Sequence, residues 1–273
     1  MAFIDNQLLR FKDSIENSIV EGGSKGKESI IRSSTLINLI HDAVKYGLIE
    51  KGLNPNNIYP RFKETKPEIK LAGELKQKDQ DICVLPSDIR RRQTVINWGP
   101  LAFEKKIDPY GFDYSNYSLV INVRSQMSSL AKNSDTLFER TFAEAQNLHM
   151  RYTNMVLGEV YLIPTYEYDD NYVKNKRVGF SNKHVDIEKY ISFFNAINNR
   201  ETDGPSYEYE RCALLIVDFR SQQPKLYHNS RELINDGLLP SNFGIEYASL
   251  SFDSFFDDIL SVYDQRFGLN HLK

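Results

Sequence analysis

The sequence contains few cysteines, and its histidines are not spaced as zinc ligands. Cys83 and Cys212 are the only cysteines in 273 residues, and both fall within apolar runs. We therefore expect two buried thiols in a reducing compartment rather than a disulfide framework. The five histidines show no paired zinc spacing. His149 falls on the apolar side of a predicted helix and is expected to be a core residue.

Long apolar runs and several enzyme motifs are also missing. No run approaches the roughly eighteen apolar residues of a membrane span, and the N-terminus has no basic stretch leading into an apolar core. We therefore expect a soluble, cytoplasmic protein. No Gly-x-Ser-x-Gly elbow indicates a nucleophile. Residues 22–27 resemble a phosphate-binding loop only superficially, because no strand precedes them and Glu28 replaces the magnesium-binding hydroxyl residue.

The charge balance neither requires nor excludes a nucleic-acid partner. The formal net charge is −3, and 41% of the residues are hydrophobic, as in ordinary globular proteins. Nucleic-acid binding needs a local basic surface rather than a basic whole. The most basic segment is 61–92. It is either a DNA-binding surface or an ordinary solvated surface. Its candidate DNA-facing residues are Lys76, Lys78, Arg90, Arg91 and Arg92.

Apolar periodicity predicts strands interleaved with helices. Helices are predicted over 3–20, 27–48, 134–149, 185–198, 230–236 and 253–266. Strands are predicted over 68–72, 81–85, 94–98, 118–124, 156–164, 212–219 and 246–252. This alternation indicates an α/β sheet with helices on both faces. We expect one domain over 1–273, with a helical subregion (1–55), a central core (65–165) and the remaining sheet, loops and closing helix (166–273).

Polar residues interrupt the strongest predicted strand. Asn122 and Arg124 are two residues apart and therefore point to the same face of the strand. A buried polar pair costs several kcal/mol, roughly, unless it is hydrogen-bonded or used. Asp81 begins an earlier strand, and Glu139 follows on the next helix. A purely structural alternative is a buried ion pair between Arg124 and Glu139 that holds the helix to the sheet.

Other carboxylates are weaker candidates. Glu144 lies further along the same helix, and Glu159 interrupts an otherwise apolar strand. Glu104 with Lys106 has the acid-x-lysine spacing, but neither residue falls on a convincing strand. Such tripeptides are common by chance, so we rank this pair behind Asp81 and Glu139.

Three segments resemble a known family. Residues 77–84 (QKDQDICV), 121–126 (INVRSQ) and 133–140 (NSDTLFER) resemble type II restriction endonucleases of the PD-(D/E)XK nuclease superfamily. Residues 233–238 (LINDGL) and 263–267 (YDQRF) are similar as well. The resemblance covers about residues 70–165 well and the rest loosely, and its motifs are degenerate.

The resemblance implies a mixed central sheet flanked by helices, a homodimer, and Mg²⁺-dependent cleavage of double-stranded DNA at a short palindrome. Asp81 would be the first metal-binding acid. Asn122 and Arg124 stand where the family has its second acid and its lysine, so both depart from the pattern. Some family branches take the second acid from the following helix, which implies Glu139. Gln126 would contact the site or the adjacent phosphate.

The departures leave alternatives open. Arginine supplies charge but cannot act as a base, so water activation would fall to the metal or to the substrate phosphate. One alternative is a sequence-specific DNA-binding protein with a degenerate nuclease site. The other is a nonenzymatic α/β interaction module in which these acids are ordinary ion-pair groups.

Overall fold

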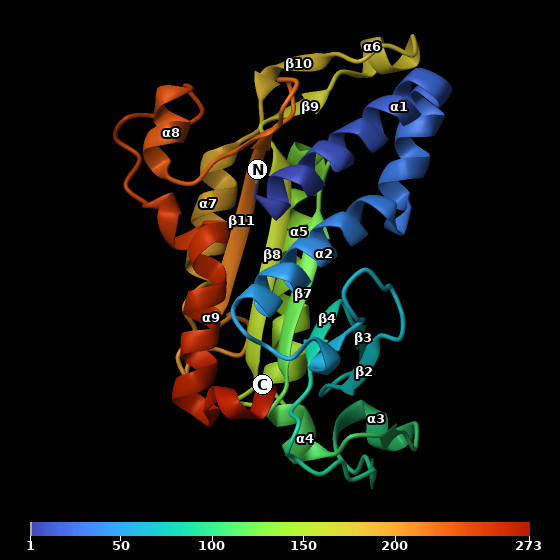
Figure 1. The fold of residues 1–273 in the computed structure, drawn as a ribbon, viewed down its shortest axis with the longest axis vertical. Coiled ribbons are helices and arrows are strands. Elements are labelled where there is room, and N and C mark those ends of the chain that lie inside the picture. The colour runs from blue at the N-terminus through green and yellow to red at the C-terminus, as the bar shows by residue number, and fades with distance from the viewer. Residues whose placement is uncertain (1) are drawn as a thin grey trace.

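A six-stranded mixed sheet lies at the centre of the molecule (Figure 1), in a computed structural model that describes residues 2–273. The strand order is β1-β4-β7-β8-β11-β12. Its bounds are β1 (Ile58–Tyr59), β4 (Ile82–Val84), β7 (Leu119–Ser125), β8 (Val156–Pro164), β11 (Arg211–Asp218) and β12 (Lys225–Leu226). Strands β7, β8 and β11 are parallel, whereas β1, β4 and β12 pair antiparallel at the edges. The sequence-based prediction of a mixed central sheet is confirmed.

The central strands are apolar because both sheet faces are covered, as is usual for parallel strands. Every residue of β8 is buried. On one face the core is formed with α1 (Phe3–Arg32), α2 (Ser34–Glu50) and α9 (Phe252–Phe267). On the other it is formed with α5 (Leu130–His149) and α7 (Ile187–Ala196). The predicted N-terminal helical region and the helices on both faces are therefore present.

Small ribbons and short helices surround this frame. The ribbons are β2 (Ile69–Ala72) with β3 (Gln77–Gln80), β5 (Thr94–Val95) with β6 (Ile107–Asp108), and β9 (Tyr166–Tyr168) with β10 (Phe180–His184). The short helices are α3 (Gly99–Phe103), α4 (Phe112–Asn116), α6 (Asp170–Lys174) and α8 (Ser230–Asn235). The 3-10 turns are η1 (Pro55–Asn57), η2 (Tyr247–Leu250) and η3 (Leu269–Leu272). Helices α3 and α4 lie at one end of the molecule, beyond the end of the sheet (Figure 1).

Three local predictions were wrong. The strand expected over 246–252 is the 3-10 turn η2, because the Glu246 carboxylate accepts the backbone N–H of Ala248 and caps a helical turn. The strand expected over 94–98 shortens to β5, since Gly99 has a φ of +54° and begins α3. The helix expected over 27–48 is divided at Ser33, where α1 ends and α2 begins. The interruption expected between residues 20 and 27 is present, as a kink in α1 at Gly23, whose φ is +57°.

Other local predictions are confirmed. Cys83 and Cys212 are free and buried. His149 is buried in the core, with its ring nitrogens 3.2 Å from the Ser206 carbonyl oxygen and 3.3 Å from that of Met155. Over residues 2–273, no helix has both the length and the apolar character needed to cross a membrane.

Candidate functional site

The polar residues of β7 face α5 and meet an acid from the neighbouring strand. In the register of β7 with β8, Asn122 lies opposite Glu159 and Arg124 lies opposite Tyr161. Directly opposed residues of neighbouring strands point to the same face. Asn122 and Glu159 are buried in this face, whereas the Arg124 side chain is 16% exposed. An acid, an amide and a guanidinium are thus brought together within an apolar sheet.

Arg124 is the centre of a charge network. Its guanidinium donates to the carboxylates of Glu144 and Glu159, and to the Thr141 hydroxyl at 3.2 Å. Lys78, on β3, donates to the same Glu144 carboxylate at 2.6 Å. The Glu159 side chain is 0% exposed and that of Lys78 is 25% exposed. The network is therefore closed on the sheet side and reaches solvent on the β3 side.

The structure contains the expected ion pair between Arg124 and the following helix, but the partner of Arg124 is not the expected Glu139. An ion pair does join β7 to α5, and Glu144 rather than Glu139 provides the carboxylate. Along an α-helix, five residues rotate a side chain by roughly 140°. Glu139 therefore points to another side of α5; it is exposed, and within residues 2–273 its side chain makes no hydrogen bond or ion pair. Its assignment as a metal ligand stays a prediction.

Burial and neighbouring charges shift the ionisation of the network in opposite directions. Burial raises the pKa of Glu159 to about 7, although Arg124 opposes this shift; Asp81 and Glu144 add to it. Burial also acts to raise the pKa of Glu144, but Arg124 and Lys78 outweigh it and hold that pKa below its ordinary value. Glu159 is therefore the more readily protonated of the two carboxylates, and Glu144 the more readily ionised.

Two buried acceptor oxygens in the network lack a partner. Within residues 2–273, neither Glu159 Oε2 nor Asn122 Oδ1 accepts a hydrogen bond, although both atoms are buried. The Asn122 amide nitrogen lies 3.4 Å from the Tyr209 hydroxyl, which itself donates to the Thr141 carbonyl oxygen at 2.9 Å. Buried acceptors are normally satisfied. This pair of oxygens therefore suits a cation or a water molecule.

Asp81 lies at the open edge of the sheet beside this network. Strand β1 pairs with Cys83 and Val84, so it stops short of Asp81. The Asp81 carboxylate accepts the backbone N–H of Val123 at 3.0 Å. Its charge also contributes to raising the pKa of Glu159. Asp81 is thus fixed by β7 and lies electrostatically within reach of the Arg124 network.

A cavity of about 460 Å³ lies on the α2 side of Asp81. His41, Lys66, Glu68 and Val123 contribute to its lining. Burial lowers the pKa of His41, although the charge of Asp81 opposes this shift, and His41 Nε2 is buried without a partner within residues 2–273. No sequence pattern singled out His41, because it comes from a helix far from the strand motifs.

Gln126 follows the end of β7 and makes no hydrogen bond to Arg124, Glu144 or Glu159 within residues 2–273. It is buried, and its side-chain oxygen accepts hydrogen bonds from the hydroxyls of Tyr161 at 3.1 Å and Tyr190 at 2.7 Å. Tyr190 also lines a separate pocket of about 320 Å³ near the carboxyl ends of β7 and β8. Gln126 therefore supports the tyrosines beneath this pocket, and its predicted contact with the site or an adjacent phosphate stays a prediction.

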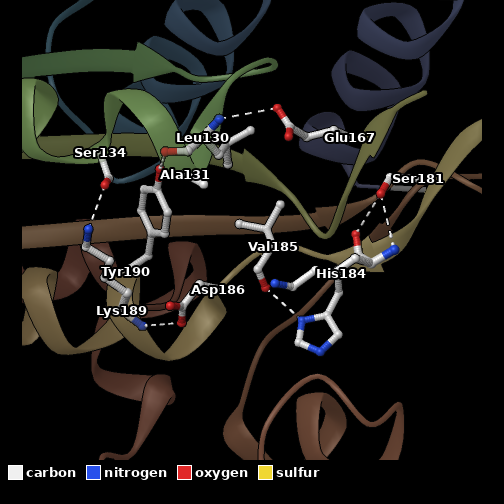
Figure 2. Close-up of a pocket in the computed structure, with 11 residues that line it drawn as sticks. Leu130, Ala131, Ser134, Glu167, Ser181, His184, Val185, Asp186, Lys189 and Tyr190 are labelled. Atoms are coloured by element: carbon white, nitrogen blue, oxygen red, sulfur yellow. Dashed lines mark hydrogen bonds between the residues drawn. The ribbon is translucent and has the colours of Figure 1, made fainter. Parts of the chain in front are cut away.

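Figure 2 shows that the polar groups of this second pocket largely satisfy one another. The Glu167 carboxylate accepts the backbone N–H of Leu130 at 3.2 Å, at the start of α5. Lys189 donates to the Ser134 hydroxyl at 2.7 Å. None of its lining residues belongs to the Arg124 network. We therefore do not assign the candidate chemistry to it.

The basic segment divides into two parts. Lys78 belongs to the Arg124 network, and Lys76 is exposed next to it and helps to lower the pKa of Glu144. The second part is exposed and lies in the segment before β5; it consists of Arg90, Arg91 and Arg92. The Arg91 guanidinium carbon stacks 4.4 Å from the centroid of the Tyr110 ring. These three arginines are free to meet an anionic surface, and their DNA contacts stay a prediction.

The residues present fit magnesium only in part. Residues 2–273 contain no group of three or more His, Cys, Asp or Glu side chains arranged to hold a metal ion. Magnesium in phosphoryl-transfer sites, however, is commonly bound by one or two carboxylates together with substrate phosphates and water. The observation in favour of a cation is the buried Glu159 oxygen that lacks a partner.

Besides His41, two acids of the Arg124 network, Glu144 and Glu159, had no role predicted from the sequence. A single acid in the nine-residue apolar strand β8 is a usable signal, because a buried carboxylate needs a compensating partner. Helix periodicity was a signal for Glu144, which lies one turn from the inward-facing Thr141 and Leu148.

Comparison with known proteins adds little. No protein-family description and no curated protein sequence matches the chain. Among solved structures, a complex of the restriction endonuclease PspGI with substrate DNA is similar, with a TM-score of 0.36 and 12% sequence identity. The alignment covers 88% of this chain and 67% of that chain. A TM-score this low does not establish a common fold, so the function must be argued from the site.

Proposed function

We propose that the protein is a magnesium-dependent endonuclease that cuts duplex DNA at a short, symmetric site, acting as a cytoplasmic homodimer. The resemblance of residues 70–165 to PD-(D/E)XK nucleases supports this proposal. The observation that carries it is the pair of unpartnered buried oxygens of Asn122 and Glu159 next to Arg124, on a network whose ionisation the charge of Asp81 influences. A two-fold protein reads a symmetric target most simply, since each subunit meets the same half-site.

The residues of the network have distinct roles in this proposal. Asp81 and Glu159 would hold the cation, which when bound stabilises charge on the phosphoryl oxygens and lowers the pKa of an attacking water. Arg124 balances the carboxylates and would stabilise the charge that develops on the phosphate. Because arginine stays protonated, it takes no proton from water. Asn122 contributes its free oxygen, and Glu139 remains the alternative second acid.

Plasmid cleavage with magnesium tests the proposal. Wild-type protein should give discrete fragments, whereas Asp81→Asn and Glu159→Gln should abolish cleavage. Asp81→Asn should retain or tighten DNA binding, because it removes a negative charge beside phosphate. Glu139→Gln tests the helix-acid assignment, and the exposed Glu188→Gln on α7 is a matched control. Folded wild-type protein that cuts no plasmid with any divalent cation would refute the nuclease.

A DNA-binding protein without cleavage is the second candidate. It is favoured because Arg124 and Lys78 already neutralise Glu144 and Glu159 in ion pairs. A salt-dependent gel shift on duplex DNA without cleavage would support it. If the protein neither binds nor cuts DNA, the remaining hypothesis is the nonenzymatic interaction module. Sedimentation of the protein alone tests the homodimer.

A further inference from the structure

An arm of the molecule exposes large apolar side chains. Residues 89–107, hereafter the β5–β6 arm, contain β5, α3 and the start of β6. Phe103 is 90% exposed, Val95 71% and Ile107 46%. Val95 and Ile107 lie directly opposite each other in the ribbon, so their side chains are neighbours on one face. Exposed apolar side chains at this density indicate an interaction surface.

The same arm is strongly cationic, although the protein is not. It contains one acid, Glu104, and five basic residues, which gives a formal charge of +4, against −3 for the whole chain. The basic residues are Arg90, Arg91, Arg92, Lys105 and Lys106. All five are exposed. The exposed pair Val95 and Ile107, the exposed Phe103 ring and the cations of the same arm are together complementary to a polyanion that also offers apolar surface.

The arm is connected to the candidate site through β3. The Gln77 side-chain amide donates to the Ile107 carbonyl oxygen at 2.7 Å. A Cβ atom added at Gly99 would lie 2.7 Å from the Glu74 carbonyl oxygen, so the start of α3 also packs closely against this segment. From Gln77, β3 leads directly to Asp81, a distance of roughly 13 Å along an extended strand. This distance is within one helical turn of duplex DNA.

We propose that the β5–β6 arm holds duplex DNA beside the candidate site, with Phe103, Val95 and Ile107 in the minor groove and the surrounding cations on the phosphates. The proposal rests on the proposed function and names the surface that positions its substrate. Apolar side chains inserted at the minor groove unstack and bend DNA, and lysine and arginine on the backbone provide the salt-dependent part of the affinity.

Charge decides between DNA and a second copy of the chain as the occupant. In a two-fold dimer joined through this surface, each arm would face the identical arm. Two surfaces of formal charge +4 would then be brought together, which opposes association. Duplex DNA supplies the opposite charge on the same scale. The arm therefore fits DNA better than its own copy.

The test uses full-length Asp81→Asn protein, so that binding is measured without cleavage. The probe is a mixed-sequence duplex with a donor and an acceptor fluorophore at its ends, which reports affinity and bending together. Phe103→Ala should weaken binding about tenfold, which corresponds to about 1.4 kcal/mol, and should reduce the bend without changing the salt dependence. Phe103→Leu should retain most of both. Because Phe103 is exposed, its replacement should leave the thermal unfolding temperature unchanged.

Two control variants separate the contributions. Replacing Arg90, Arg91 and Arg92 by glutamine should lower the slope of affinity against salt by about one for each phosphate that these arginines neutralise. Val20→Ala on α1, where Val20 is 55% exposed, should change neither affinity nor bend. Unchanged affinity and bend in Phe103→Ala would overturn the proposal. A change in the oligomeric state of Phe103→Ala protein in the absence of DNA would also overturn it, because the arm would then contact a second copy of the chain. Plasmid cleavage by the wild-type protein distinguishes the two proposals. Cleavage that Phe103→Ala does not change would refute only the proposed role of the β5–β6 arm. DNA binding that depends on Phe103 but occurs without cleavage would refute only the proposed nuclease activity.

Discussion

The buried carboxylate of Glu159 should make the stability of the protein fall as the pH rises. Its pKa is raised to about 7 in the folded protein, from an ordinary value of 4.5. Between these two values the folded state binds more protons than the unfolded state. Unfolding free energy therefore decreases with increasing pH across this window. A pKa difference of one corresponds to about 1.4 kcal/mol, so the whole effect amounts to about 3 kcal/mol.

Substitution isolates this effect from every other titrating group. Glu159→Gln removes the ionisation but keeps the size of the side chain. The unfolding free energy of the wild-type protein, relative to that of Glu159→Gln, should fall by about 3 kcal/mol from pH 4.5 to 7 and then level off. Urea unfolding in EDTA, repeated through this range, measures the difference directly.

Glu144 provides the matched comparison because its pKa is lowered, by Arg124 and Lys78 against the effect of burial. Its stabilising contribution is present above its unfolded pKa and is lost as the pH falls through the folded value. The wild-type protein should therefore lose stability relative to Glu144→Gln toward acid, the opposite of the result for Glu159→Gln. Parallel curves of unfolding free energy against pH for wild-type and Glu159→Gln protein would refute the reasoning.

Two further predictions concern the core. The Glu210 side chain is 0% exposed, and its carboxylate accepts hydrogen bonds from Arg200 at 2.9 Å, from Arg266 at 2.8 Å and from the backbone N–H of Leu157 at 2.7 Å. Glu210→Ala leaves these buried charges without a partner and should lower the free energy of unfolding, measured in urea, by about 3–5 kcal/mol. A loss below about 1 kcal/mol would contradict this prediction. Gly158→Ala should cost about 1–3 kcal/mol, because the added Cβ would lie 2.7 Å from Ile259 and 2.9 Å from Phe255. The control Gly22→Ala, with no atom within 4 Å, should be neutral or stabilising.

Local patterns in the sequence were sufficient for the main elements. The apolar runs that became β7, β8 and β11 are continuous because strands covered on both faces have no polar side. The amphipathic spacing of α5 and α9 likewise predicts helices that pack one apolar face against the core. The prediction for 246–252 was wrong because a side-chain cap at Glu246, rather than apolar alternation, determines the backbone there.

The sequence by itself determined that Asn122 and Arg124 share one face of a strand, since that follows from the two-residue period of β structure. Which carboxylates they meet was decided only by the tertiary structure. Glu144 and Glu139 belong to the same helix, and the rotation of α5 against the sheet selects Glu144. Glu159 reaches Arg124 because β8 aligns beside β7 in one particular register. Strand register and helix rotation depend on the packing of the whole core, which no local pattern specifies.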